Sequence, residues 1–177
     1  MKQIKYQLRY ALPVWFTSLL FGWLPDNKIS IKIRGYFISL FLPGRPKNLT
    51  LGRDITFLGI NTLFIGNNVY IAKGCWLNAL GTIEIKDDVM LAPYCVLATT
   101  RHTYKNGSFK YGKTILKKII ISQGAWVSAH CTITQNVTVG KSNIIAANSV
   151  VVKDTKDFKM YAGVPAKEIK DIEYEKN

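Results

Sequence analysis

The sequence has few of the residues that most often carry metal or covalent chemistry. Its 177 residues include only two histidines, His102 and His130, and three cysteines, which is an odd number. No pair of cysteines shows CxxC spacing. A disulfide framework and a zinc site are therefore both disfavoured, and no metal is expected.

Acidic residues are also scarce. Lys and Arg number 24 against 11 Asp and Glu, which gives a formal charge of +13. The excess is concentrated in residues 1–53, where Asp26 is the only acid, and in residues 101–118, which contain none. This balance favours an anionic partner such as a phosphorylated cofactor, an acidic glycan or a membrane surface. Nucleic acid is disfavoured because no helix-turn-helix, RRM or zinc-finger pattern accompanies the charge.

The sequence also lacks an apolar run long enough to span a membrane. The uncharged stretch at residues 10–25 is shorter than the ~20 residues that a spanning helix needs, and no A-x-A cleavage site follows it. Two interpretations of the basic, apolar segment 1–49 stay open. It could lie in a membrane interface with Trp15 and Trp23 near the headgroups, or it could pack on the rest of the domain. A second apolar stretch, residues 35–44, could pack with the first.

From residue 51 onward, apolar residues recur every six positions, with two shifts of two residues. A period of six fits neither an amphipathic helix nor a long strand. It predicts a parallel solenoid over residues 50–155, in which three six-residue blocks make one triangular coil and the first residue of each block points inward. The expected inward residues are Leu51, Phe57, Ile65, Ile71, Leu77, Ile85, Leu91, Leu97, Ile121, Val127, Ile133, Val139, Ile145 and Val151.

The cysteines obey the same rule. Cys75, Cys95 and Cys131 each fall at the fifth position of a block, where a small side chain is expected to point inward. We therefore expect buried, unreactive thiols and no cysteine nucleophile.

Repeats of the form aliphatic–small–x–x–small–x resemble those of the hexapeptide-repeat acyltransferases. The endings "IIAANSVVVKD" and "YAGVPAKEI" are similar to that family's last coil and coenzyme A-binding tail, so the match covers about residues 50–170. Within the family the chain is most similar to small sugar O-acetyltransferases, including those of bacterial surface-polysaccharide synthesis. The resemblance implies an all-β solenoid, a left-handed parallel β-helix, with a tail at residues 156–177 that ends in a short helix.

The repeat breaks after Leu97, in the stretch "LATTRHTYKNGSF". Because the interior of the coil is filled, we expect residues 99–118 to leave it as a loop at a corner, with Asn106-Gly107 as a turn. In the family, the catalytic histidine stands at the start of this loop, and His102 matches it. A neutral imidazole can take a proton from an attacking hydroxyl and pass it to the leaving thiolate, while a backbone N–H stabilises the oxyanion.

The resemblance also implies that acetyl-CoA is the acyl donor, in a ternary complex. The alternative for His102 is an exposed loop histidine, and His130 is expected at the surface or rim. Asn78 is a candidate to bind the acceptor, the alternative being a corner asparagine. For the three lysines among the cofactor-binding candidates named next, the alternative is a solvated surface charge. By resemblance, the cofactor-binding residues are Trp126, Ala129, Ala147, Lys153, Lys167 and Lys170.

Three other functions have to be set against this one. A hexapeptide-repeat carbonic anhydrase needs three histidines on one zinc, and this chain has two. The other two alternatives have the same solenoid fold. One is a non-catalytic binding module, and the other is an acetyltransferase of an amino sugar or an antibiotic. The family further implies a homotrimer with sites in the subunit clefts and a sugar or glycan acceptor that could be lipid-linked. The expected location is the cytoplasm, which could include the cytoplasmic face of the inner membrane.

Overall fold

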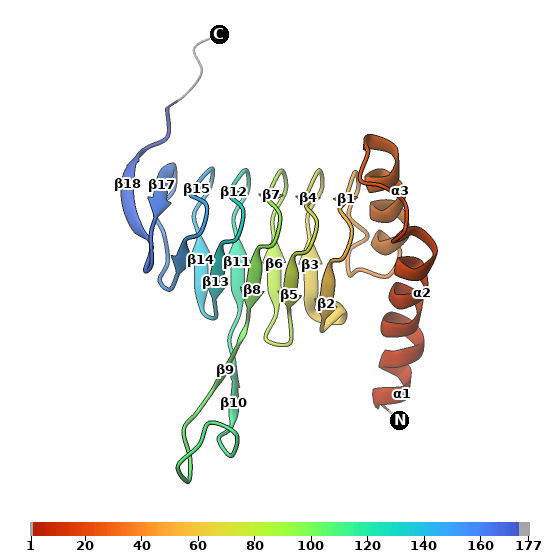
Figure 1. Cartoon of the computed structure of the whole chain (residues 1–177), viewed down its shortest axis with the longest axis horizontal. Helices are drawn as coiled ribbons and strands as arrows, with labels where there is room; N and C mark the ends of the chain where they lie inside the picture. Colours follow the sequence, from red (N-terminus) through yellow and green to blue (C-terminus); the bar gives the residue numbers. More distant parts are fainter. Residues whose placement is uncertain (1, 174–177) are drawn as a thin grey trace.

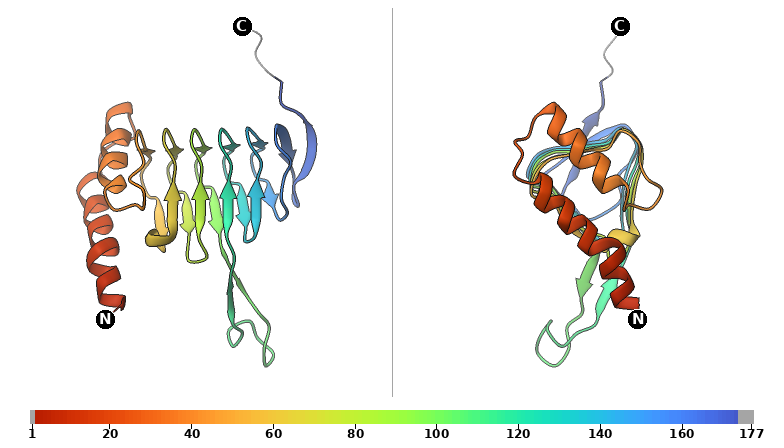
Figure 2. Two further views of the ribbon diagram at one scale, coloured as in Figure 1. Left: turned by 180° about the vertical axis from the view of Figure 1, so that it is seen from behind. Right: turned by 90° about the vertical axis from the view of Figure 1, so that its right-hand side faces the viewer.

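The computed structural model describes residues 2–173, which form a parallel β-helix closed at its N-terminal end by helices (Figure 1). Three sheets form the faces of a triangular prism, seen end-on in Figure 2, and their strands are parallel except for β18. The seven-stranded face contains β1 (Thr50–Leu51), β4 (Tyr70–Ile71), β7 (Met90–Leu91), β12 (Trp126–Val127), β15 (Ile144–Ile145), β17 (Lys159–Ala162) and β18 (Lys167–Asp171). The five-stranded face contains β2 (Thr56–Leu58), β5 (Trp76–Asn78), β8 (Val96–Ala98), β13 (Thr132–Thr134) and β16 (Val150–Val151). The four-stranded face contains β3 (Leu63–Ile65), β6 (Ile83–Ile85), β11 (Ile119–Ile121) and β14 (Val137–Val139).

The six-residue period correctly identifies the core. Thirteen of the fourteen expected inward residues are buried, and Phe57 is partly buried against the same core. Each is paired with an inward apolar residue of a neighbouring coil, as Leu77 is with Leu97, so the inward residues stack in columns. This stacking explains why the pattern is visible in the sequence.

The two shifts in the repeat are both wide turns at one corner of the prism, between the five- and four-stranded faces. The first contains the short helix η2 (Ile60–Thr62), and the second is the turn at residues 79–82. Thr50 pairs with Tyr70 and Tyr70 with Met90, so each of these coils takes twenty residues. The break after Leu97 occurs at the same corner, one coil later.

The three cysteines form an inward column of free thiols. Each thiol donates a hydrogen bond to a backbone carbonyl in the next coil, Cys75 to Ala92 at 3.2 Å and Cys95 to Ser128 at 3.1 Å. Interaction with Cys75, together with burial, raises the pKa of Cys95, and burial raises the pKa of Cys131. A raised pKa keeps a thiol protonated, so these two are poor nucleophiles.

Four helical segments cover the N-terminal end of the solenoid: α1 (Lys2–Tyr6), the π-helical η1 (Gln7–Ala11), α2 (Leu12–Phe21) and α3 (Lys28–Ser39). The first three run as one continuous helix, and α3 lies beside it across the end of the prism (Figure 2). Phe21 stacks on Phe37 with ring centroids 4.8 Å apart, which confirms that the two apolar stretches pack together. Asn27 caps α3 by accepting hydrogen bonds from the amides of Ile29 and Ser30.

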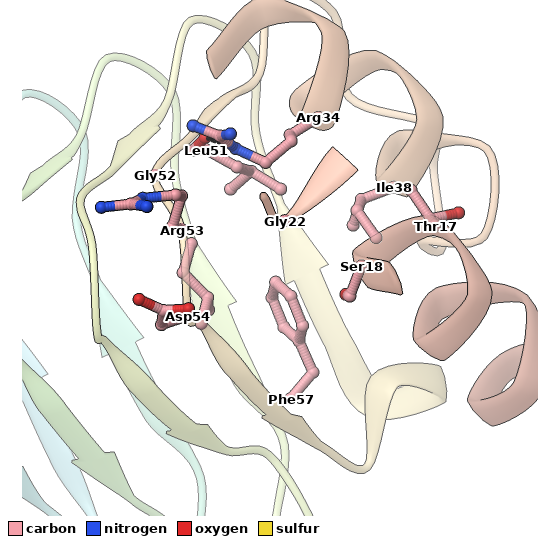
Figure 3. Close-up of a pocket in the computed structure, with 11 residues that line it drawn as sticks. Thr17, Ser18, Gly22, Arg34, Ile38, Leu51, Gly52, Arg53, Asp54 and Phe57 are labelled. Atoms are coloured by element: carbon pink, nitrogen blue, oxygen red, sulfur yellow. Dashed lines mark hydrogen bonds between the residues drawn. The ribbon is translucent and has the colours of Figure 1, made fainter. Parts of the chain in front are cut away.

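Arg34 ties the helices to the first coil. Its buried guanidinium donates to the carbonyl of Leu51 at 2.9 Å, to carbonyls at the end of α2, and to the carboxylate of Asp26. Beside it lies a cavity of about 110 Å³ between α2, α3 and β1 (Figure 3). None of the residues predicted for catalysis or cofactor binding lines this cavity. The adjacent Gly35 is required for close packing, because a Cβ there would lie 1.8 Å from the carbonyl oxygen of Leu49.

The predicted C-terminal helix is wrong. Residues 156–173 contain no helix: β17 continues the seven-stranded face parallel to β15, and β18 folds back antiparallel to it. A charged segment of this length is a marginal helix on its own, whereas the open edge of the sheet satisfies its backbone groups directly. Residues 174–177 of the predicted tail lie outside the described residues.

Candidate active site

The break in the repeat is a β-hairpin that projects from the third coil (Figure 1). Its strands are β9 (Thr100–His102) and β10 (Thr114–Leu116), paired antiparallel so that His102 faces Thr114. Asn106 and Gly107 both have positive φ, at 48° and 77°, in agreement with the predicted turn. The extruded loop expected from the sequence is thus present, and it has strand pairing of its own.

The root of the hairpin is held by buried polar contacts. Thr99 is fully buried, and its hydroxyl donates to the carbonyl of Asn78 at 2.6 Å and accepts from the amide of Gly81 at 2.8 Å. The side-chain amide of Asn78 donates to the hydroxyl of Thr100 at 3.1 Å. These contacts fix the chain two residues before His102 to the coil below it.

The surroundings of Asn78 therefore differ from those of a residue in an open acceptor site. Asn78 is only 5% exposed, and its side-chain oxygen Oδ1 accepts a hydrogen bond from the amide of Leu80. Both polar atoms of the amide are occupied within the chain. In this structure Asn78 supports the root of the hairpin.

His102 is exposed on β9, and its Nδ1 lies 3.4 Å from the hydroxyl oxygen of Thr114. No other hydrogen bond of its ring occurs among residues 2–173. In the tautomer in which Nδ1–H donates to the Thr114 hydroxyl oxygen, Nε2 keeps a free lone pair, as a general base requires. His130 lies elsewhere, at a corner of the fourth coil, where it stacks on Tyr94 with ring centroids 5.1 Å apart.

The hairpin that carries His102 also carries exposed positive charge. Lys118, where the hairpin re-enters the coil, pairs with Glu84 at 3.1 Å, and hydrogen bonds from Lys86 and Lys118 hold the pKa of Glu84 below its ordinary value. The other basic side chains of the hairpin form no ion pair among the described residues, and aromatic rings are exposed near its tip. These exposed side chains are Arg101, Tyr104, Lys105, Phe109, Lys110, Tyr111, Lys113 and Lys117.

The predicted pantetheine-binding residues lie on a different edge of the prism. Trp126 is exposed on β12, and Ala129 and Ala147 occupy the corner between the seven- and five-stranded faces. The two alanines are on adjacent coils, linked by the hydrogen bond from the amide of Asn148 to the carbonyl of Ala129. Small side chains there leave the backbone accessible to an extended ligand. Within one chain, however, the structure does not bring these residues to His102.

The three predicted phosphate-binding lysines are all exposed near the C-terminal end of the solenoid. Lys153 follows β16, on the same edge as the hairpin but two coils farther along. Lys167 and Lys170 both belong to β18, where Lys170 pairs with Glu173 at 2.7 Å. Lys153 and Lys167 form no ion pair among the described residues, so they remain the better candidates for anion binding.

Two residues of the site were not predicted, Thr99 and Thr114. The register of the hairpin places Thr114 opposite His102, and the irregular tip hides that register in the sequence. Thr99 carried a weak signal, because it is a polar residue two positions after the inward Leu97 and before the chain leaves the coil. Within residues 2–173 no cluster of three or more His, Cys, Asp or Glu could hold a metal ion.

Sequence and structure comparisons give a consistent result. No family model matches the chain. Galactoside O-acetyltransferase of Escherichia coli K12 is 31% identical over 112 residues, which are 63% of this chain and 55% of the relative. Galactoside O-acetyltransferase of Lactococcus lactis is 30% identical over 108 residues, 58% of this chain and 52% of the relative. The chain thus spans about half the length of these relatives.

Solved structures share the fold. A hexapeptide-repeat acetyltransferase of Vibrio cholerae superposes with a TM-score of 0.79 and 22% identity, covering 96% of this chain and 94% of the other. A maltose O-acetyltransferase of Clostridium difficile gives a TM-score of 0.79 and 24% identity, covering 91% and 85%. The predicted left-handed parallel β-helix is confirmed. By its repeats, its fold and its sequence relatives, the chain is similar to the hexapeptide-repeat acetyltransferases.

Proposed function

We propose that this protein transfers an acetyl group from acetyl-CoA to a hydroxyl of a sugar, with His102 as the general base. The observation that carries the proposal is the position of His102: the hairpin that interrupts the coil between Leu97 and Ile119 is rooted in the solenoid and exposed, and it carries a histidine with one hydrogen-bonded ring nitrogen. The relatives named as galactoside O-acetyltransferases support the same reaction.

In the proposed reaction the acceptor hydroxyl attacks the thioester carbonyl as Nε2 of His102 takes its proton. The tetrahedral intermediate then collapses, the C–S bond breaks, and the proton passes to the leaving thiolate, so that coenzyme A and the O-acetyl sugar are released. No covalent enzyme intermediate is needed. This agrees with the buried, hydrogen-bonded state of the cysteines.

Coenzyme A is proposed to bind along the edge formed by Trp126, Ala129 and Ala147, with Lys153 and Lys167 near its phosphates. A galactoside acetyltransferase that shares the fold at a TM-score of 0.70 was solved in complex with coenzyme A. Since this edge and the hairpin of one chain are separated by a whole face of the prism, the site is proposed to form between subunits of a homotrimer. A hairpin that projects away from its own coil suits that arrangement.

The acceptor is proposed to be a glycan of bacterial surface-polysaccharide synthesis, which could be attached to a lipid. The name of one relative, WbbJ of Escherichia coli, suggests O-acetyl transfer in lipopolysaccharide biosynthesis; it is 23% identical over 138 residues, 71% of this chain and 68% of WbbJ. The exposed basic and aromatic side chains of the hairpin suit an anionic or ring-shaped acceptor.

The test compares the two histidines. Release of free thiol from acetyl-CoA, measured with a panel of glycan acceptors, is expected to fall by at least about a hundredfold in His102→Ala, the usual contribution of a general base. His130→Ala is the matched control; because His130 follows Ala129 on the proposed cofactor edge, the control value is kcat, which is expected to stay at the wild-type level. Thiol release that survives unchanged in His102→Ala would refute the assignment, and absence of release with any acceptor would favour a non-catalytic binding module.

A further inference from the structure

The N-terminal helix carries an apolar face that nothing among residues 2–173 covers. Its inner side packs on the solenoid and α3, through buried Val14 and Thr17 and the partly buried rings of Tyr6 and Tyr10. Its outer side is also apolar, and Trp15 is 60% exposed and Trp23 75% exposed. We call this outer side the helix face; it consists of Ile4, Leu8, Leu12, Trp15, Phe16, Leu19, Leu20 and Trp23.

These residues recur at intervals of three and four, so they form one continuous stripe along the helix. α2 contains no charged residue, which makes it apolar on both sides. A helix that is apolar all round is normally buried all round. Eight large side chains left in water on one stripe therefore point to a missing partner.

The location of the stripe narrows the choice of partner. The helices lie across the end of the solenoid, and the end-on view of Figure 2 shows them in front of the coil. A broad, nearly flat surface can approach this end without touching the three faces or the hairpin. No helix among residues 2–173 is long and apolar enough to cross a membrane, so contact with a bilayer would be with its surface.

The charge of the N-terminal helices indicates which kind of surface they would contact. The exposed basic residues Lys5, Arg9, Lys28 and Lys32 lie on the same helices, and none forms an ion pair among the described residues. Asp26, the only acid in residues 1–53, is already bound by Arg34 and Arg53. This end is therefore positive, which favours an anionic surface and opposes end-to-end pairing of two copies of the chain.

We propose that the helix face docks this protein on an anionic lipid bilayer. The apolar stripe would enter the boundary between headgroups and acyl chains, the two tryptophans would sit at headgroup level, and the basic residues would contact the lipid phosphates. Lipid binding stands independently of the proposed acetyl transfer.

Docking in this way sets the orientation of the molecule. The solenoid axis would stand roughly perpendicular to the membrane, because the helices cover its end (Figure 2). β8, from which the hairpin starts, is two strands from β2 in its sheet, and strands are ~4.8 Å apart. Adding the ~10 Å diameter of a helix puts the hairpin root about 20 Å from the membrane surface. A glycan on a lipid carrier could reach this height, a step that does rest on the proposed function.

The experiment is vesicle flotation of the full-length protein, with phosphatidylglycerol–phosphatidylcholine vesicles against phosphatidylcholine alone. We expect wild type to float with the anionic vesicles and less with the neutral ones. Trp15→Gln with Leu19→Gln is expected to lower the partition coefficient at least about tenfold, because two large apolar side chains no longer leave water. Lys5→Glu with Arg9→Glu is expected to abolish the preference for anionic vesicles.

The matched control is Leu80→Gln, since Leu80 is 52% exposed at a corner of the solenoid and outside the helix face. It is expected to float like wild type, and so is His102→Ala, which separates lipid binding from catalysis. Circular dichroism and thermal melting confirm that each variant is folded. Two results would overturn the proposal. The first is that wild type floats with neither kind of vesicle. The second is that light scattering shows a wild-type oligomer that Trp15→Gln with Leu19→Gln dissociates, while this double variant floats as wild type does.

Discussion

Replacing Thr99 with valine tests whether the root of the hairpin positions His102. Valine has nearly the same shape as threonine, so packing is kept while the hydroxyl is lost. Two hydrogen bonds are lost with it, the 2.6 Å bond to the carbonyl of Asn78 and the 2.8 Å bond from the amide of Gly81. The Asn78 carbonyl keeps the amide of Thr99 as a donor at 3.2 Å, but the half-buried amide of Gly81 loses its acceptor. The free energy of unfolding should fall by about 2 kcal/mol.

The expected effect on catalysis is larger than the effect on stability. Thr99 lies three residues before His102, and a displacement of about 1 Å at a reacting group can cost on the order of a hundredfold in rate. We therefore expect kcat/KM to fall by at least about tenfold in Thr99→Val while the protein stays folded. Thr99→Ser is the matched control: it keeps both hydrogen bonds and loses a methyl group, which costs about 1 kcal/mol of stability.

The assays are urea unfolding followed by circular dichroism and thiol release from acetyl-CoA with a competent acceptor. If Thr99→Ser loses as much activity as Thr99→Val, the hydroxyl does not position the hairpin. If Thr99→Val keeps both wild-type stability and wild-type kcat/KM, the reasoning about the root is wrong.

Three further predictions follow from the packing and the exposed charges. Gly35→Ala gains about 1 kcal/mol of helix propensity but places a Cβ 1.8 Å from the Leu49 carbonyl, so urea unfolding should show a net loss of about 2 kcal/mol; a stabilised variant would contradict the close approach of α3 to β1. The three buried thiols should not react with a thiol reagent in the folded protein and should all react after denaturation; a thiol that reacts within seconds in the native state would contradict the inward column. Lys153→Ala with Lys167→Ala should raise the KM for acetyl-CoA several-fold with kcat little changed, whereas Lys141→Ala, an exposed lysine on the solenoid, should leave KM unchanged; equal KM values in all three proteins would show that these lysines are ordinary surface charges.

A feature could be predicted from the sequence where the residues that cause it lie close to it in the chain. The inward residues were predictable because every coil repeats the same local rule, so that Leu77, Leu97 and Ile133 occupy equivalent positions. The hairpin was predictable as an interruption of that rule, and Asn106-Gly107 as a turn that tolerates positive φ. Each of these signals lies within a few residues of the feature that it predicts.

The features that were missed depend on pairing between distant segments. β18 is a strand because the edge of the seven-stranded face offers β17 as a partner, and nothing within the charged segment itself signals this. Asn78 fits an acceptor site by residue type, but its side chain is occupied by Thr100, which is 22 residues away. For segment 1–49 the sequence left two interpretations open. The structure shows the inner side of the N-terminal helix packed on the domain and its outer side exposed.

The separation of His102 from Trp126, Ala129 and Ala147 leads to a last prediction, on subunit complementation. A single chain carries these groups on different edges, so a complete site needs the hairpin of one subunit and the cofactor edge of another. We expect His102→Ala and Ala147→Trp, which places a bulky side chain on the proposed pantetheine path, each to be inactive alone. When the two are co-expressed with different tags and purified through both tags, some clefts combine an intact hairpin with an intact edge. In a three-membered ring of head-to-tail contacts, every trimer that carries both tags has one intact cleft out of three, and activity should recover to about a third of wild type. Activity that stays at zero in doubly tagged oligomers would mean that each site is built within one chain, and that the hairpin folds back on its own coil during catalysis.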